Sequence, residues 1–96
     1  MDLLAIQPYV KVTRIVDLEQ KNIVQHRQIY LYRNRIVTRY RRFPIEDVLD
    51  ISFRKVGGEG GLLFLHTVQG IFSYVVETSP KLFIQAFKVH IKGDMI

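Results

Sequence analysis

Arginines interleaved with tyrosines form the one segment of this chain whose residue types suggest ligand binding. The tyrosines are Tyr30, Tyr32 and Tyr40, and the arginines are Arg33, Arg35, Arg39, Arg41 and Arg42. Arginine contacts phosphates, and an aromatic ring can stack on a nucleic-acid base. No acidic residue occurs between Gln20 and Phe43. We therefore take the five arginines as a candidate anion-binding strip. The alternatives are that they are solubility charges on a solvent-exposed sheet surface and that two of the three tyrosines are core residues.

No pattern in the chain predicts catalysis, a cofactor or a metal site. The three histidines, His26, His66 and His90, fall on different predicted elements and lack the spacing of metal ligands. No serine lies in the Gly-x-Ser-x-Gly context of a nucleophile. We therefore expect the protein not to be an enzyme.

Two further clusters have simpler interpretations than chemistry. Glu46, Asp47 and Asp50 surround a predicted turn beside Pro44, which is typical of a solvated acidic patch rather than a general acid–base pair. The glycines at 57, 58, 60 and 61 are not followed by the Gly-Lys-Ser/Thr of a phosphate-binding loop. We expect this segment to be a mobile hairpin connection.

Short runs rich in β-branched and aromatic residues predict an antiparallel sheet. Strands are expected over residues 9–18, 29–32, 36–40, 49–56, 62–68 and 71–78, with turns at 19–22, 33–35, 57–61 and 69–70. Residues 23–24 are expected to resume pairing, Pro44 to break the strand, and residues 45–48 to form a brief turn or helical coil. Alternation predicts Ile36, Thr38 and Tyr40 on one face and Val37, Arg39 and Arg41 on the other.

One helix is predicted at the C-terminal end. Ser79 or Thr78 is a suitable N-cap, Pro80 suits the first helical position, and Gly93 is a plausible C-cap. From residue 81 to 92 the apolar positions recur at helical spacing and predict a wide apolar stripe; they are Leu82, Phe83, Ala86, Phe87, Val89 and Ile91.

Composition bounds the class of protein. The 96 residues fit a single domain over 1–96, and 48% hydrophobic residues suffice for a core. There is no cysteine, so disulfides and thiolate metal sites are excluded. No run approaches the roughly 18 apolar residues of a membrane span, and the N-terminus does not read as a signal peptide. We expect a cytoplasmic domain, with peripheral attachment to a membrane as the alternative.

From residue 29 onward the chain resembles the bacterial pleckstrin-homology-like (PH-like) domains. Four segments carry the resemblance: a basic hairpin at 29–37, an apolar-Pro-Ile segment at 43–51, a glycine-opened hairpin at 60–70 and a polar-Pro-x-x-Phe-Ile helix start at 77–84. The resemblance implies a mainly β (α+β) fold, a bent antiparallel sheet or partial barrel of about seven strands capped by one C-terminal helix. Residues 1–28 depart from the pattern, and the basic loop of eukaryotic phosphoinositide binders has no counterpart there.

These observations predict a non-enzymatic interaction domain that binds protein partners or self-associates. An open edge strand of a small sheet is a simple site for pairing with a partner or a second copy. The alternative is a basic adaptor that binds membrane headgroups or nucleic acid through the Arg33–Arg42 strip. No small-molecule substrate is evident.

Overall fold

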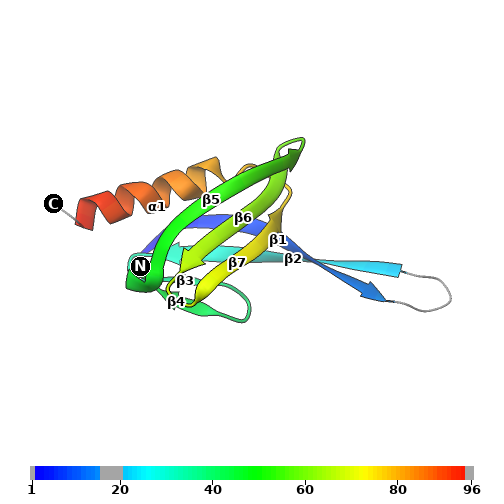
Figure 1. Ribbon diagram of the computed structural model, residues 1–96, viewed down its shortest axis with the longest axis horizontal. Helices are drawn as coiled ribbons and strands as arrows, with labels where there is room; N and C mark the ends of the chain where they lie inside the picture. The colour runs from blue at the N-terminus through cyan, green and yellow to red at the C-terminus, as the bar shows by residue number, and fades with distance from the viewer. Residues whose placement is uncertain (1, 16–20, 95–96) are drawn as a thin grey trace.

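The computed structural model describes residues 2–15 and 21–94, which form a mainly β domain with one C-terminal helix (Figure 1). The strands are β1 (Leu3–Ile15), β2 (Lys21–Tyr32), β3 (Arg35–Val37), β4 (Arg42–Pro44), β5 (Val48–Gly57), β6 (Gly60–Thr67) and β7 (Gly70–Val76). A 3-10 turn, η1 (Ile45–Asp47), precedes β5, and the helix is α1 (Lys81–Asp94). The predicted fold class is confirmed.

The seven strands form one antiparallel sheet in the order β4-β3-β2-β1-β7-β6-β5. Its two halves are joined weakly, because β1 and β7 share a single residue pair, Val10 with Val75. The sheet bends at this junction and is not closed, and α1 lies across its concave side (Figure 1). A hollow can therefore form where β1 and β7 diverge.

The first two strands form a long hairpin that extends past the rest of the sheet (Figure 1). Pairing runs from Leu3 opposite Tyr32 to Ile15 opposite Lys21. The predicted strand over 9–18 therefore begins six residues too late. The predicted turn over 19–22 is wrong at Lys21 and Asn22, which belong to β2 because cross-strand pairing continues to them. Residues 16–20 lie outside the described part of the chain.

The core lies between the concave side of the sheet and one face of the helix. Alternate strand residues point into it, as period-2 geometry requires. Its fully or almost fully buried side chains include Ile29, Leu31, Ile36, Ile51, Leu63, Leu65, Val76, Phe83 and Phe87. This core anchors the strands whose ends carry the candidate site.

The segment around Tyr40 differs from its prediction. The strand expected over 36–40 ends at Val37, so alternation places Ile36 and Thr38 inside but fails at Tyr40, which is 71% exposed. Pro44 does not break a strand but ends β4, since a proline without an N–H is tolerated on a short edge strand. The brief turn expected over residues 45–48 is confirmed as η1.

The glycine-rich segment is more ordered than predicted. Only Gly58 and Glu59 form the turn, and Gly58 adopts a φ of 54°, which favours glycine. Gly60 and Gly61 belong to β6, where a Cβ would overlap the backbone oxygens of Val76 and Arg54 respectively. Close backbone packing, not flexibility, therefore explains these two glycines.

The helix begins as predicted but ends later. Ser79 Oγ accepts a hydrogen bond from the Lys81 N–H at 3.3 Å, which confirms the cap. Gly93 lies inside the helix rather than at its C-cap. The predicted apolar stripe was too wide, because Leu82 and Val89 face solvent while Phe83 and Phe87 are buried.

A candidate anion-binding groove

The predicted arginine strip is divided by the structure into separate parts. The three-residue strand β3 lies between the turn that carries Arg33 and the loop that carries Arg39 and Arg41. At about 3.3 Å per residue, three strand residues span about 10 Å. The five arginines therefore do not form one continuous site.

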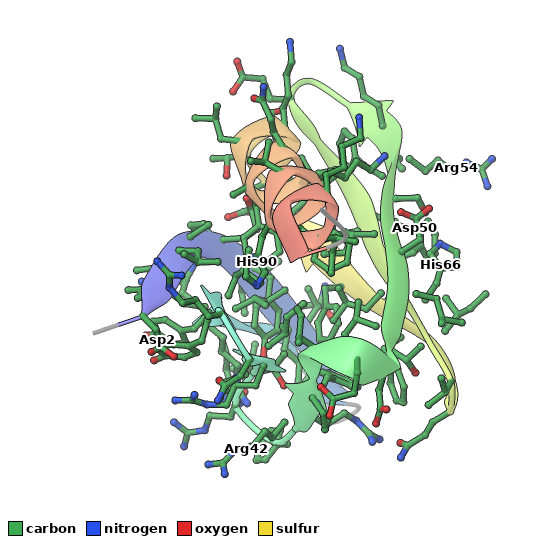
Figure 2. All side chains as sticks on the ribbon, turned by 90° about the vertical axis from the view of Figure 1, so that its left-hand side faces the viewer. Asp2, Arg42, Asp50, Arg54, His66 and His90 are labelled. Carbon is green, nitrogen blue, oxygen red and sulfur yellow. The ribbon has the colours of Figure 1, made fainter. Side chains whose placement is uncertain are left out.

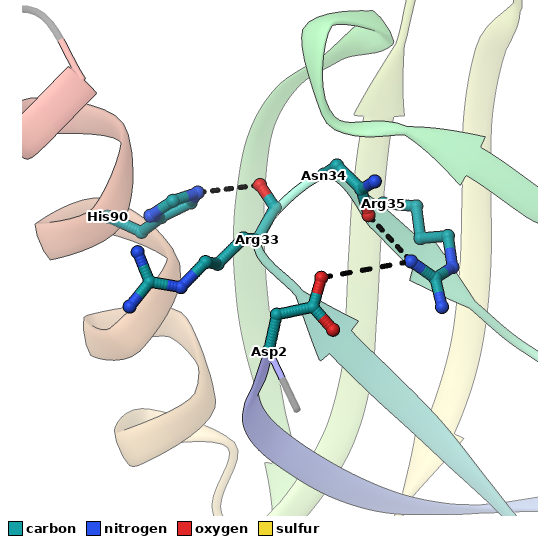
Figure 3. Close-up of polar contacts among 5 residues, drawn as sticks. All are labelled: Asp2, Arg33, Asn34, Arg35 and His90. Atoms are coloured by element: carbon teal, nitrogen blue, oxygen red, sulfur yellow. Dashed lines mark hydrogen bonds and ion pairs between the residues drawn. The ribbon is translucent and has the colours of Figure 1, made fainter.

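Arg33 and Arg35 lie at the turn between β2 and β3, where their contacts link this turn to the helix α1 and to Asp2 (Figure 3). The His90 Nε2–H of α1 donates a hydrogen bond to the Arg33 carbonyl oxygen at 2.7 Å. Arg35 donates to Asn34 Oδ1 at 2.6 Å and lies 4.0 Å from the Asp2 carboxylate. Its guanidinium also stacks on the Tyr32 ring, 4.2 Å from the centroid. Arg35 thus has internal partners that reduce its availability to a ligand.

Arg42 lies on the edge strand β4 and is exposed. Its side chain extends into solvent, far from Asp50 and His66 (Figure 2). It does not line the groove described next. Arg42 is therefore a convenient reference cation for experiments on that groove.

Tyr40 is the centre of a cluster of positive charge. Its ring centroid lies 4.9 Å from the Arg27 guanidinium carbon, 5.6 Å from Lys11 Nζ and 5.9 Å from the Arg39 guanidinium carbon. These distances fit cation–π contacts. Because strands β1 and β2 pair Tyr9 with Arg27 and Lys11 with Gln25, alternation places Tyr9, Lys11 and Arg27 on one face of the hairpin. The exposed Tyr40 ring lies over that face.

A groove of about 310 Å³ opens beside Tyr40, between β1, β7 and the loop of residues 38–41. We call it the Tyr40 groove; it is lined by Tyr9, Val10, Lys11, Val12, Arg27, Thr38, Tyr40, Arg41, Ser73, Tyr74 and Val75. An adjoining hollow of about 290 Å³ shares Arg27 and Thr38 and adds Arg39 and His26. None of the described residues that line either hollow is acidic. The lining of these two hollows therefore presents positive charge and neutral hydrogen-bonding groups, while Glu77 lines a third hollow that shares Tyr9, Val10 and Arg27.

Short-range contacts hold the walls of the groove. The Thr38 N–H donates to the Arg41 carbonyl oxygen at 2.9 Å, and the Arg41 N–H donates to Thr38 Oγ1 at 3.2 Å. Arg41 stacks on Phe72, 4.4 Å from its ring centroid. Tyr9 and Tyr74 meet edge to face with centroids 5.0 Å apart. The loop is thus fixed against the sheet, and the groove is preformed.

Arg27 retains an unused donor. Its Nη2 donates to Gln25 Oε1 at 2.5 Å, whereas its buried Nη1 has no hydrogen-bond partner in the described structure. A buried donor without an acceptor costs free energy until an acceptor arrives. Because Nη1 has almost no exposed surface, an external oxygen would reach it only if the Arg27 side chain moved.

The tyrosine pKa values report the electrostatics of the groove. The pKa of Tyr40 is lowered by Arg27 and, to a smaller extent, by Arg39; each acts through a hydrogen bond and through its positive charge. Burial raises the pKa of Tyr74, against a smaller lowering by Thr38 and Arg41. A site that stabilises a phenolate on Tyr40 is also suited to hold an external anion.

Sequence reasoning missed two cations of the site, Lys11 and Arg27. Arg39 and Arg41 are placed near them only by the β1–β2 register and the bend of the sheet. The alternation of Tyr9, Lys11 and Thr13 along β1 was a usable signal, but the strand that would pair with it could not be assigned from local pattern.

A separate serine–histidine contact lies on the outer face of the sheet. Ser52 Oγ and His66 Nε2 are 2.7 Å apart, and Asp50 pairs across the strands with His66. Neither Ser52 nor His66 lines the Tyr40 groove or the hollow that adjoins it. In residues 2–15 and 21–94 no group of three or more candidate side chains is placed to hold a metal ion.

Comparison of the chain with protein-family models, with curated proteins and with solved structures gives no match. The fold itself defines the class, a seven-stranded antiparallel sheet with a C-terminal helix. Within the described residues, no helix has the length and apolar character needed to cross a membrane.

Proposed function

We propose that the chain is a non-enzymatic interaction domain of PH-like architecture, and that it holds an anionic segment of a protein partner in the Tyr40 groove. One observation carries the proposal. Three cations surround an exposed tyrosine at the rim of a preformed groove that has no acidic residue among its described lining. The strand order and the capped C-terminal helix support the PH-like assignment.

The geometry favours the groove over the whole arginine strip as the binding site. Arg35 is engaged by Asp2, Asn34 and the Tyr32 ring. Arg39 and Arg41 instead have no carboxylate partner in the described structure, and each lines a hollow that Arg27 also lines. Charge-assisted hydrogen bonds from guanidinium to carboxylate or phosphate are the strongest contacts such a site can offer.

The chemistry recognised is therefore a carboxylate or phosphate group presented with an apolar neighbour. The cations supply the charged contacts, while Val12, Val75 and the Tyr40 ring supply apolar and aromatic surface. A protein segment that carries both acidic and apolar side chains fits both kinds of surface. We place the domain in the cytoplasm, free or at a membrane surface, where such partners occur.

Two charge-matched double variants test the site. R39E/R41E reverses two cations of the groove region, and R33E/R42E reverses two arginines outside it, with the same change in net charge. Binding of a fluorescein-labelled acidic peptide is measured by anisotropy, and anionic vesicles and single-stranded oligo(dT) serve as parallel probes. Every measurement is repeated across a range of salt concentrations, because charge-driven binding weakens as the Debye length falls to about 10 Å at 0.1 M.

The proposal predicts that R39E/R41E lowers peptide affinity at least tenfold while R33E/R42E changes it less than threefold. Equal losses in the two variants would show that net charge, not the groove, drives binding. Tighter binding of vesicles or oligo(dT) than of the peptide, with the same loss in R39E/R41E, would replace the acidic segment with a lipid or nucleic-acid ligand.

A further inference from the structure

We infer that the partner of the Tyr40 groove is a second copy of this chain, which presents an apolar and acidic surface around Leu49. We call that surface the Leu49 patch; it comprises Glu46, Asp47, Leu49, Asp50, Val68 and Ile71. The inference rests on the proposed function of the groove, and it names the partner of that site.

The Leu49 patch exposes three large aliphatic side chains close together. Leu49 is 66% exposed, Val68 60% and Ile71 63%. The Val68 N–H donates to the Asp47 carbonyl oxygen at 3.0 Å, which joins η1 to the turn between β6 and β7. Asp50 pairs with His66, which in turn pairs with Ile71. The pairing shift between Val48 and Asp50 leaves Leu49 at a bulge, and bulges commonly redirect a side chain.

The charges of the patch and of the groove are complementary. In the described structure the carboxylates of Glu46, Asp47 and Asp50 make no ion pair. The same holds for Lys11, Arg27, Arg39 and Arg41 around the groove. Each surface therefore has apolar side chains bordered by unpaired charge of one sign, and the two signs are opposite.

One copy cannot place its own patch in its own groove. Both surfaces include residues of β7, Ile71 for the patch and Ser73 and Val75 for the groove, which lie about 7 Å and about 13 Å from Ile71 along the strand. The strand is held on β6 from Gly70 to Val76, so the two surfaces stay apart. A contact between the patch of one copy and the groove of another is therefore intermolecular. Made reciprocally it closes a two-fold dimer, and made in one direction it builds rings or open chains.

The test is a mixing experiment on the full chain with two variants that neutralise charge. The groove variant R39Q/R41Q keeps an intact patch, and the patch variant E46Q/L49S/D50N keeps an intact groove. Both variants change only exposed side chains, and circular dichroism with thermal melting verifies their folding. E59Q, which neutralises an exposed acid in the turn between β5 and β6, is the control. Mass is measured by sedimentation velocity and light scattering up to about 0.5 mM, because an exposed charged interface is often weak.

The inference predicts that the wild-type chain and E59Q form dimers or larger species as concentration rises. Each interface variant alone is then monomeric, and an equimolar mixture of the two forms a 1:1 dimer and nothing larger. A monomeric wild type, association of either interface variant alone, or a mixture that stays monomeric would overturn the inference.

The same samples separate this inference from the proposed function. The acidic peptide is added to the patch variant, whose groove is intact and not occupied by another copy. Peptide binding together with a monomeric wild type overturns only the second-copy partner. Failure of the peptide to bind the patch variant, together with a monomeric wild type, removes both.

Discussion

Replacing Phe83 with alanine tests which face of α1 packs against the sheet, and the same replacement at the neighbouring Leu82 is the control. Phe83 is 2% exposed and belongs to the core, whereas Leu82 is 79% exposed. The two positions differ by one residue, which is about 100° of rotation around the helix. The pair therefore reports the rotational setting of α1 directly.

The magnitudes follow from burial. Phenylalanine to alanine in a core costs about 3–5 kcal/mol, because transfer free energy is lost and a cavity remains. A 96-residue domain has a free energy of unfolding of about 5–14 kcal/mol by the usual per-residue range. Phe83→Ala should thus remove a large part of the stability, whereas Leu82→Ala should change it by no more than about 0.5 kcal/mol.

Urea denaturation followed by far-ultraviolet circular dichroism measures both variants. The account predicts a much lower midpoint for Phe83→Ala and an unchanged midpoint for Leu82→Ala, with similar slopes. If Phe83→Ala does not fold, Phe83→Leu provides a milder test, with an expected loss of about 1–2 kcal/mol. Equal losses at the two positions, or a larger loss at Leu82, would refute the packing described for α1.

Two further predictions concern the tyrosines and the glycines. Because the pKa of Tyr40 is lowered, its ionised form stabilises the fold above pH about 10, and this contribution is lost as the pH falls through the pKa in the folded state. The pKa of Tyr74 is raised, so its neutral form favours the folded state below pH about 10, and this contribution is lost as the pH rises through the pKa in the folded state. In a pH titration followed by tyrosinate absorbance, Tyr40→Phe should therefore remove an ionisation that begins below pH about 10, and Tyr74→Phe should remove one that lies above it. An unchanged ionisation below pH about 10 in Tyr40→Phe would contradict the charge cluster. Gly61→Ala should lower the melting temperature strongly, because its Cβ would overlap the backbone of Arg54. Gly57→Ala should not lower it, because there is open space at that position. Equal melting temperatures for the two variants would contradict the close packing of β5 and β6.

Local patterns in the sequence predicted much of the fold for identifiable reasons. Alternation and β-branched content marked β5, β6 and β7, and Ser79 followed by Pro80 marked the start of α1. The long β1–β2 hairpin was only partly predicted, because its register depends on cross-strand pairing rather than on turn residues. The width of the helix stripe was overestimated, since spacing alone does not tell which flank of an apolar face meets the sheet.

The candidate site was predicted in part. The strip from Arg33 to Arg42 contains Arg39 and Arg41, which lie at the groove region, and also Arg33 and Arg42, which do not. Tyr40 was expected to share a face with Ile36, but β3 ends at Val37 and the loop turns the ring outward. Lys11 and Arg27 reach the site through strand pairing, a tertiary feature that residue spacing along the chain does not encode.

A titration of the ¹⁵N-labelled chain with an acidic peptide, followed by amide chemical shifts, tests the central claim most directly. To keep the groove free of other copies, it is carried out on dilute protein and repeated on E46Q/L49S/D50N. The account predicts that the largest shifts fall on Lys11, Thr38, Tyr40, Arg41 and Ser73, around the groove. Shifts centred on Arg33, Arg35 and Arg42, or none at all, would contradict it.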